Sequence, residues 1–120
     1  MYKRQVYRNL LAGKYKLVYV APERLDYAGF GNVAQKLQIS FLAVDEAHCI
    51  SQWGQDFRPS YLRIVNFVDS LPRRPVLGAY TATATDTVRK DVEKILKLNQ
   101  PVRAVTGFDR PNLYLSLIHI

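Results

Sequence analysis

Short apolar runs that alternate with helix-like segments are the feature that most constrains the fold of this chain. Each run is four to six residues long and is separated from the next by a longer segment. Within these segments, apolar residues recur every three or four positions, as on the buried face of a helix. Because parallel strands need a long crossover between them, the alternation predicts an α/β fold, a parallel sheet with flanking helices. The predicted strands are residues 17–20, 39–44, 75–80 and 102–105.

The segments between the predicted strands carry helix signals. The first helix is expected to end near Gly13, since glycine commonly follows a helix C-terminus. The last helix is expected to begin at Thr85 or Asp86, because either side chain can cap the free N–H groups there. Apolar positions at helical spacing also predict helices over 30–37 and 61–68.

Composition narrows the class of protein and of partner. The chain has 120 residues, a length typical of one domain, and its formal net charge of +7 favours a polyanionic partner. A single cysteine, Cys49, excludes an internal disulfide and a four-cysteine zinc site. The apolar runs are too short to span a bilayer, and no apolar signal-peptide region follows the N-terminus. We therefore expect no membrane partner, and a cytoplasmic location in a bacterium or an intracellular or nuclear one in a eukaryote.

Two acidic residues follow directly on the predicted strand at 39–44. Ligands of parallel α/β sheets bind beyond the carboxyl ends of the strands, so this pair is placed to meet a ligand. Asp45 could hold Mg²⁺ through water, and Glu46 could reach an attacking water. For an acidic pair in isolation, a solvated turn is the simpler interpretation.

The neighbouring residues make the pattern much more specific. Residues 45–48, Asp-Glu-Ala-His, resemble the DEAH form of the Walker B motif of superfamily 2 helicases. The sequence continues over 49–61 as Cys-Ile-Ser-Gln-Trp-Gly-Gln-Asp-Phe-Arg-Pro-Ser-Tyr, which resembles the aromatic-rich loop of RecQ-family DNA helicases. Residues 19–25 are similar to the motif Ib of that family, 81–85 to its motif III, and 108–113 to the segment that closes its first RecA-like domain. With the DEAH tetrad and the loop that follows it counted as one match, the four matches occur in family order.

The resemblance implies an ATP-dependent DNA helicase that moves 3′ to 5′ on single-stranded DNA, with ATP and Mg²⁺ as cofactors. By the same resemblance, Asp45 coordinates the Mg²⁺ of bound ATP through water and Glu46 is the catalytic base. His48 then links the nucleotide site to the DNA-binding elements. Its alternatives are a zinc ligand beside Cys49, which the absence of a second cysteine disfavours, or an ordinary buried histidine. Cys49 itself is most simply a small buried residue.

The expected loop at 51–60 carries the aromatic residues. In the family, this loop senses single-stranded DNA and triggers ATP hydrolysis. Trp53 and Phe57 would stack on unpaired bases, and Arg58 would contact a phosphate or support the stacking. On composition alone, packing of the two rings beneath the loop is the simpler interpretation. Gln55 stands where the family commonly has histidine. Glutamine can still form hydrogen bonds but cannot be protonated. If coupling of DNA binding to ATP hydrolysis needs an ionisable ring at this position, the substitution weakens it.

Three further side chains are assigned by the same resemblance. Arg24, beside Glu23, lies in a region that the family places near the nucleic-acid path, whereas a surface ion pair is the alternative. Thr81 and Thr83 would hydrogen-bond the DEAH residues and pass hydrolysis on to domain motion, with ordinary strand packing as the alternative. A basic N-terminal cluster is either a solvated helix face or a contact to the DNA backbone. Its members are Lys3, Arg4, Arg8, Lys14 and Lys16.

No phosphate-binding loop is found in the sequence. Around Gly13-Lys14, Arg8 stands at the position of the first glycine of the motif and Tyr15 at that of its hydroxyl residue. We therefore expect an incomplete RecA-like, P-loop NTPase-type helicase domain that lacks the Walker A strand. Residues 1–114 would be the C-terminal part of the first RecA-like domain, and 115–120, similar to a translated sequencing adapter, a non-native tail. The Walker A segment and the second RecA-like domain would lie outside this chain, and single-stranded and forked DNA would be its partners. Alone, the chain would be inactive and marginally stable.

Two other functions stay open at this point. Trp53, Phe57 and Arg58 on a basic surface also fit a non-catalytic single-stranded nucleic-acid-binding module. An RNA helicase with the same DEAH tetrad is the other alternative, and the aromatic-rich loop argues against it.

Overall fold

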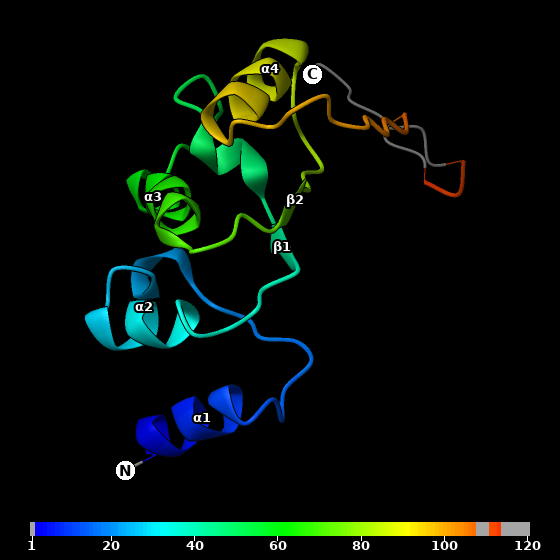
Figure 1. The fold of residues 1–120 in the computed structure, drawn as a ribbon. Helices are drawn as coiled ribbons and strands as arrows, with labels where there is room; N and C mark the ends of the chain where they lie inside the picture. Colours follow the sequence, from blue (N-terminus) through cyan, green and yellow to red (C-terminus); the bar gives the residue numbers. More distant parts are fainter. Residues whose placement is uncertain (1, 108–110, 114–120) are drawn as a thin grey trace, which may run out of the picture.

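The computed structural model describes residues 2–107 and 111–113. The predicted tail at 115–120 lies outside the described residues, as does part of the predicted closing segment at 108–113. Figure 1 shows the helices rising in chain order from α1 at one end to α4 at the other. With η marking a 3₁₀ helix, the elements in order are α1 (Tyr2–Leu11), η1 (Pro22–Arg24), α2 (Ala28–Ala34), β1 (Phe41–Val44), η2 (Ala47–Ile50), η3 (Pro59–Tyr61), α3 (Leu62–Ser70), β2 (Val76–Ala79) and α4 (Asp86–Ile95).

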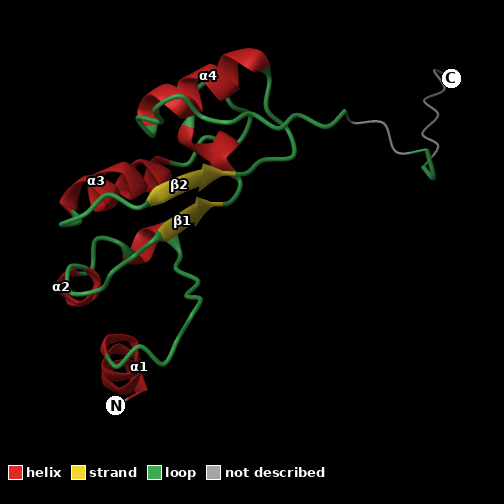
Figure 2. Ribbon diagram, turned by 45° about the vertical axis from the view of Figure 1, so that its right-hand side comes forward, coloured by secondary structure: helices red, strands yellow, loops and turns green. Residues whose placement is uncertain are grey.

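The described residues form a two-stranded parallel sheet in which β1 pairs with β2 (Figure 2). Phe41 lies opposite Val76, and the pairing continues in register to the last residue of each strand. It extends past β2, because the Tyr80 N–H donates to the Val44 carbonyl at 2.9 Å and the Tyr80 carbonyl accepts from Ala47 N at 2.9 Å. The predicted α/β class and the parallel direction of these two strands are confirmed.

The other two predicted strands, 17–20 and 102–105, are wrong: neither is a strand among the described residues. Their apolar side chains face outward, with Leu17 at 69%, Tyr19 at 91% and Val102 at 98% exposure. Strand structure needs a neighbouring strand to take up the backbone hydrogen bonds. No described strand lies beside either segment, so high β-propensity leaves each of them extended and unpaired.

The predicted helices are confirmed, and the end of α1 and the start of α4 have the expected local chemistry. Gly13, at a φ of 68°, follows α1, and its N–H donates to the Leu10 carbonyl at 3.0 Å while Lys14 N donates to the Asn9 carbonyl. At the start of α4, Thr85 is the cap, and its hydroxyl accepts from the Val88 N–H at 3.4 Å. Sequence reasoning did not foresee the 3₁₀ helices.

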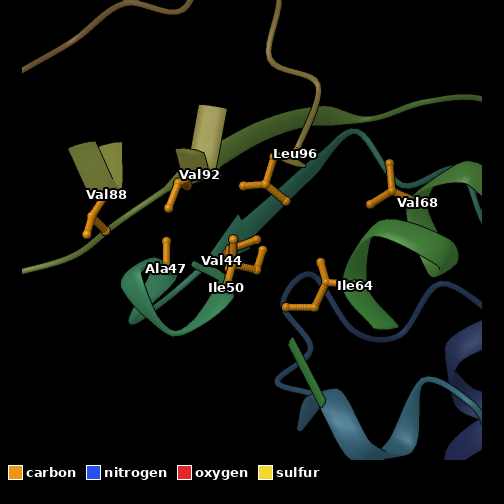
Figure 3. Packing of buried hydrophobic residues seen from close by; sticks show 8 residues of the cluster. All are labelled: Val44, Ala47, Ile50, Ile64, Val68, Val88, Val92 and Leu96. Carbon is orange, nitrogen blue, oxygen red and sulfur yellow. The ribbon is translucent and has the colours of Figure 1, made fainter. Parts of the chain in front are cut away.

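One apolar cluster joins β1, η2, α3 and α4 (Figure 3). Its helical members recur at intervals of four residues, as Ile64 and Val68 do on α3 and Val88 and Val92 on α4, so each helix turns one stripe inward. The cluster consists of Val44, Ala47, Ile50, Ile64, Val68, Val88, Val92 and Leu96. The acidic turn after β1 is therefore built directly on the most buried part of the molecule.

A chain of aromatic rings connects the helices farther from this cluster. Tyr7 on α1 lies 6.5 Å from Phe30 on α2, and Phe30 stacks on Phe67 of α3 with 5.8 Å between ring centroids. Rings at these separations attract through dispersion and their quadrupoles. This arrangement attaches α1 and α2 to α3.

One face of the sheet is open. Phe41 is 49% exposed and Val76, its partner in register, is 67% exposed, whereas Val44 on the opposite face is buried. Parallel sheets are usually covered on both faces. The molecule is elongated, at 58 × 31 × 24 Å. Among the described residues, no helix has the length and apolar character needed to cross a membrane.

Candidate functional site

An exposed acidic turn leaves the carboxyl end of β1. Glu46 adopts a left-handed conformation, with a φ of 48°, which ends the strand abruptly and starts η2. Its N–H donates to Asp45 Oδ1 at 2.9 Å, so one oxygen of the Asp45 carboxylate is used locally. Strained backbone of this kind persists where the surroundings hold it, and Ala47, the next residue, is anchored to Tyr80 and fully buried. The two carboxylates are thus presented to solvent from a rigid base.

His48 connects the acidic turn to the segment after β2. The ring is 8% exposed, and its Nδ1 lies 2.8 Å from Thr81 Oγ1 and 3.3 Å from Glu46 Oε2. The same ring nitrogen thus contacts both the hydroxyl of Thr81 and the carboxylate of Glu46. Thr81 Oγ1 also accepts from the Thr83 N–H at 3.3 Å. The structure therefore brings together Glu46, His48 and Thr81, three residues that the sequence singled out.

The aromatic loop, residues 51–58, is fixed at both ends. At its far end the Arg58 N–H donates to the Cys49 carbonyl at 2.9 Å, and near its start Gly54 N donates to the Ser51 carbonyl at 3.1 Å. Gly54 also passes close to the acidic turn, because a Cβ at this position would lie 2.7 Å from the His48 carbonyl oxygen. The loop thus folds back onto η2, and Trp53 is left 76% exposed at its surface.

A hollow of about 270 Å³ separates the aromatic loop from the residues that follow β2. Trp53 and Gln55 line it from the loop, Thr83 lines it from the opposite side, and His48 forms part of its wall. Two polar side chains and an indole ring therefore face one space that borders the acidic turn. The structure places Thr83 here and gives its side chain no hydrogen bond to the DEAH residues among those described.

The remaining predicted site residues, Arg24, Phe57 and Arg58, do not line this hollow. Arg24 is exposed on η1, which packs against η3 and α3. Phe57 is half-buried, and Arg58 is exposed at the start of η3. A hydrogen bond from its own backbone lowers the pKa of Glu23, with further lowering by the Ser60 hydroxyl and by the charges of Arg63 and Arg58. Glu23 therefore stays ionised beside the end of the loop.

Burial governs the two weak acids beneath the acidic turn. Desolvation raises the pKa of the Cys49 thiol, and the charges of Asp56 and Glu46 raise it further. Desolvation likewise raises the pKa of Tyr61, which is half-buried beside the core. Cys49 is 1% exposed and stays a neutral thiol, which confirms its interpretation as a small buried residue.

Comparison with known protein families identifies the chain. Residues 2–92 match the family described as DEAD/DEAH box helicase. The chain belongs to this family. The match covers the acidic turn, the aromatic loop and most of α4.

Individual relatives of this DEAD/DEAH box helicase chain are much longer proteins. It is 40% identical to the ATP-dependent DNA helicase RecQ of Pasteurella multocida, over 97% of the chain and 18% of that protein. It is 45% identical to the RecQ helicase of Bacillus subtilis, over 92% of the chain and 19% of that protein. A protein of Acanthamoeba polyphaga mimivirus, whose name describes an ATP-dependent RNA helicase, is 46% identical over 96% of the chain and 21% of that protein. The chain thus spans about a fifth of the length of these relatives.

Sequence reasoning about this DEAD/DEAH chain missed three residues that build the loop. Ser51 is fully buried, and its hydroxyl donates to the Asp91 carboxylate of α4 at 2.5 Å. Gly54 is needed for the close approach to the His48 carbonyl. The available signal was the presence of a serine and a glycine within an otherwise bulky aromatic segment, since small residues often mark close backbone packing. Nothing in the sequence pairs Ser51 with Asp91, forty positions away.

Proposed function

We propose that this chain is the part of a RecQ-type, ATP-dependent 3′–5′ DNA helicase that carries the Mg²⁺- and water-binding half of the ATP site together with a loop that senses single-stranded DNA. One observation carries the proposal. His48 touches Glu46 and Thr81 and also borders the hollow lined by Trp53. A single buried ring thus links the acidic turn, the segment after β2 and the aromatic loop. RecQ-type relatives at 40% and 45% identity support the assignment.

The acidic turn has the chemistry that phosphoryl transfer requires, which is charge neutralisation and a positioned nucleophile. The Asp45 carboxylate is a hard oxygen ligand, exposed at a strand end, and it would hold Mg²⁺ through water. When bound, the ion neutralises charge on the phosphate oxygens. Within residues 2–107 and 111–113, no group of three or more acidic, histidine or cysteine side chains could hold a metal, so water and phosphate oxygens would complete its coordination.

Glu46 is the proposed base for the attacking water. Its carboxylate is exposed on the same turn as Asp45, and the contact at 3.3 Å with His48 Nδ1 limits its orientations. A carboxylate held in this way can accept a proton from water at a defined position. His48 and Thr81 are then positioning residues, because they act through Glu46 and not on the nucleotide.

The aromatic loop is the proposed detector of unpaired bases. The exposed Trp53 ring offers a stacking surface, and base stacking on an aromatic side chain contributes about 1–3 kcal/mol per base. Arg58 would contact the backbone near Phe57, Gln55 would hydrogen-bond within the hollow, and Arg24 would lie farther along the DNA path. The net charge of +7 supports a polyanionic partner.

The domain proposal is that residues 1–114 are the C-terminal part of a first RecA-like domain whose Walker A strand lies outside the chain. Three observations support it. The described sheet has only two strands, its apolar face at Phe41 and Val76 is open, and relatives are about five times longer. A neighbouring strand and covering helices would give the parallel sheet the burial such sheets require. The segment 115–120 is proposed to lie outside the domain.

The test is ATP hydrolysis by the complete protein that contains this chain. We expect single-stranded DNA to stimulate phosphate release, and Glu46→Gln, which removes the base and keeps the side-chain shape, to lower the rate by about 10²–10⁴-fold. The matched control is Glu93→Gln, an acidic residue of α4 that pairs with Arg103. Stimulated hydrolysis that survives Glu46→Gln at the wild-type rate would contradict the proposal.

A second candidate, a non-catalytic single-stranded nucleic-acid-binding module, is favoured by the 76% exposure of Trp53. It predicts salt-dependent binding of oligonucleotides by the 120-residue chain, lost in Trp53→Ala, and no ATP hydrolysis by the complete protein. An RNA helicase is a further alternative, because the name of the mimivirus relative describes an ATP-dependent RNA helicase. Hydrolysis stimulated more strongly by RNA than by DNA of the same sequence would favour that function instead.

A further inference from the structure

The Ser51–Asp91 hydrogen bond joins the aromatic loop to a helix that is distant in sequence. Ser51 is fully buried at the start of the loop, and its Oγ lies 2.5 Å from Asp91 Oδ2 on α4. The same Oγ accepts from the backbone N–H of Trp53 at 3.2 Å. One hydroxyl therefore bridges the Asp91 carboxylate and the backbone of the most exposed aromatic residue of the loop.

The polarity of this bridge follows from the chemistry of its groups. An ionised carboxylate can only accept, so the single hydroxyl proton of Ser51 is directed to Asp91. Hydroxyl-to-carboxylate bonds are charge-assisted and among the stronger ones in proteins. With its proton committed, Ser51 Oγ presents its lone pairs elsewhere, and Trp53 N–H uses one of them. Removing the carboxylate would free the hydroxyl to rotate and would weaken its hold on Trp53.

We propose that Asp91 is a positioning residue for the aromatic loop: it orients the Ser51 hydroxyl, which in turn holds the backbone of Trp53 in place. The proposal rests on the proposed function in one respect: the fixed position of Trp53 would present its indole ring to unpaired bases. It also makes α4 a second support of the loop. The helix begins after its cap Thr85, a few residues beyond Thr81, whose hydroxyl contacts His48.

Amide hydrogen exchange of the ¹⁵N-labelled 120-residue chain, followed by NMR, tests the proposal. Ser51→Ala and Asp91→Ala should each accelerate exchange of the Trp53 amide by about five- to tenfold, the effect of one lost hydrogen bond. In the double variant the acceleration should be no larger, because both changes break the same bridge. Glu93→Ala, which removes a nearby carboxylate of α4 that pairs with Arg103, is the matched control and should leave this amide unchanged.

A general loosening of the fold is distinguished by the Arg58 amide. This group donates to the Cys49 carbonyl at the other end of the loop and should keep its wild-type exchange rate in Asp91→Ala. If Arg58 accelerates as much as Trp53, or if Trp53 does not accelerate in Asp91→Ala, the positioning role is overturned. If Asp91→Ala fails to fold, Asp91→Asn replaces it in the test, because asparagine keeps a neutral acceptor. This variant should accelerate exchange of the Trp53 amide less than Asp91→Ala would, and of no other loop amide. An unchanged Trp53 amide in Asp91→Asn would also overturn the positioning role.

A second measurement separates this proposal from the proposed function. Trp53 is the only tryptophan of the chain, so fluorescence excited at a wavelength that tyrosine does not absorb reports on the loop. Titration with an oligothymidylate should change this fluorescence in the wild type, and Asp91→Ala should weaken the apparent affinity at least twofold. A wild-type chain with the expected amide pattern and no response to the oligonucleotide contradicts the DNA-sensing role and leaves the role of Asp91 intact. Binding that is equally tight in Asp91→Ala overturns the positioning role and leaves DNA sensing intact.

Discussion

Two segments of similar composition have opposite structures in this molecule. The run that becomes β1 pairs with β2 and ends at Val44, which is 3% exposed. The run at 17–20 is as rich in apolar and β-branched residues, yet Tyr19 is 91% exposed and no strand forms. The difference is the neighbour, because only β1 has a described partner strand for its backbone. Strand structure is therefore set by what lies beside a segment as much as by its own residues.

The comparison also separates the site from its surroundings. The acidic turn, His48 and the base of the aromatic loop rest on the cluster shared by β1, η2, α3 and α4. These parts are held by contacts within the chain. The segment at 17–20 and the open face of the sheet have no such support among the described residues. The proposed catalytic and sensing residues thus lie in the self-supported region, and the open surfaces are where the rest of the proposed helicase domain would pack.

The largest expected effect comes from removing a core side chain beneath the site. Ile50 on η2 is fully buried, so Ile50→Ala leaves a cavity and should lower the free energy of unfolding by about 2–5 kcal/mol. Val18→Ala removes two methyl groups from the unpaired run at 17–20 and should change the free energy of unfolding by less than about 0.5 kcal/mol. Denaturant unfolding followed by circular dichroism measures both. Equal losses would show that 17–20 is as well packed as the site.

A smaller effect is expected where the aromatic loop touches the acidic turn. Gly54→Ala brings a Cβ within 2.7 Å of the His48 carbonyl, and the resulting displacement should cost about 1–3 kcal/mol and shift Trp53 emission. Gly31→Ala is the matched control. It lies in α2 with open space around the added methyl, and should raise stability by about 0.5–1 kcal/mol. A Gly54→Ala chain with unchanged melting and emission would refute the tight contact.

The smallest effect concerns the other unpaired run, 102–105. Arg103 holds it to α4 through two hydrogen bonds of 2.6 Å to the Glu93 carboxylate, and these bonds lower the Glu93 pKa from its ordinary 4.5. A carboxylate with a lowered folded-state pKa stabilises the fold above its unfolded pKa and loses that contribution as the pH falls through the folded value. Arg103→Ala should therefore melt slightly lower than wild type at neutral pH.

The pH dependence of that difference is the check. In acid, below the lowered pKa of Glu93, the two melting temperatures should converge, because protonation removes the same interaction from the wild type. Both side chains are partly exposed, so the neutral-pH difference should also shrink in high salt. A difference that persists unchanged in acid would mean that Arg103 acts through packing and not through its charge.

Much of the fold was predictable because its signals are local. Helical spacing of apolar residues located the four α-helices, and of the two predicted caps for α4, Thr85 and Asp86, the structure uses Thr85. The predicted strands at 17–20 and 102–105 failed because pairing is not a local property. In the site, Asp45 and Glu46 could be predicted to lie together because they are neighbours in the sequence. The Ser51–Asp91 bond and the approach of Gly54 to His48 depend on how η2 packs against α4, which no spacing rule encodes.

In the proposed function, the acidic turn after β1 binds the metal–nucleotide complex that drives DNA unwinding. The most direct measurement compares Asp45→Ala with Asp69→Ala in the complete protein, using forked DNA and ATP. Asp69 is a surface carboxylate of α3 that pairs with Lys97, so it controls for the loss of one negative charge. The account predicts that Asp45→Ala abolishes unwinding and that Asp69→Ala retains it. Unwinding by Asp45→Ala at the wild-type rate would contradict the account.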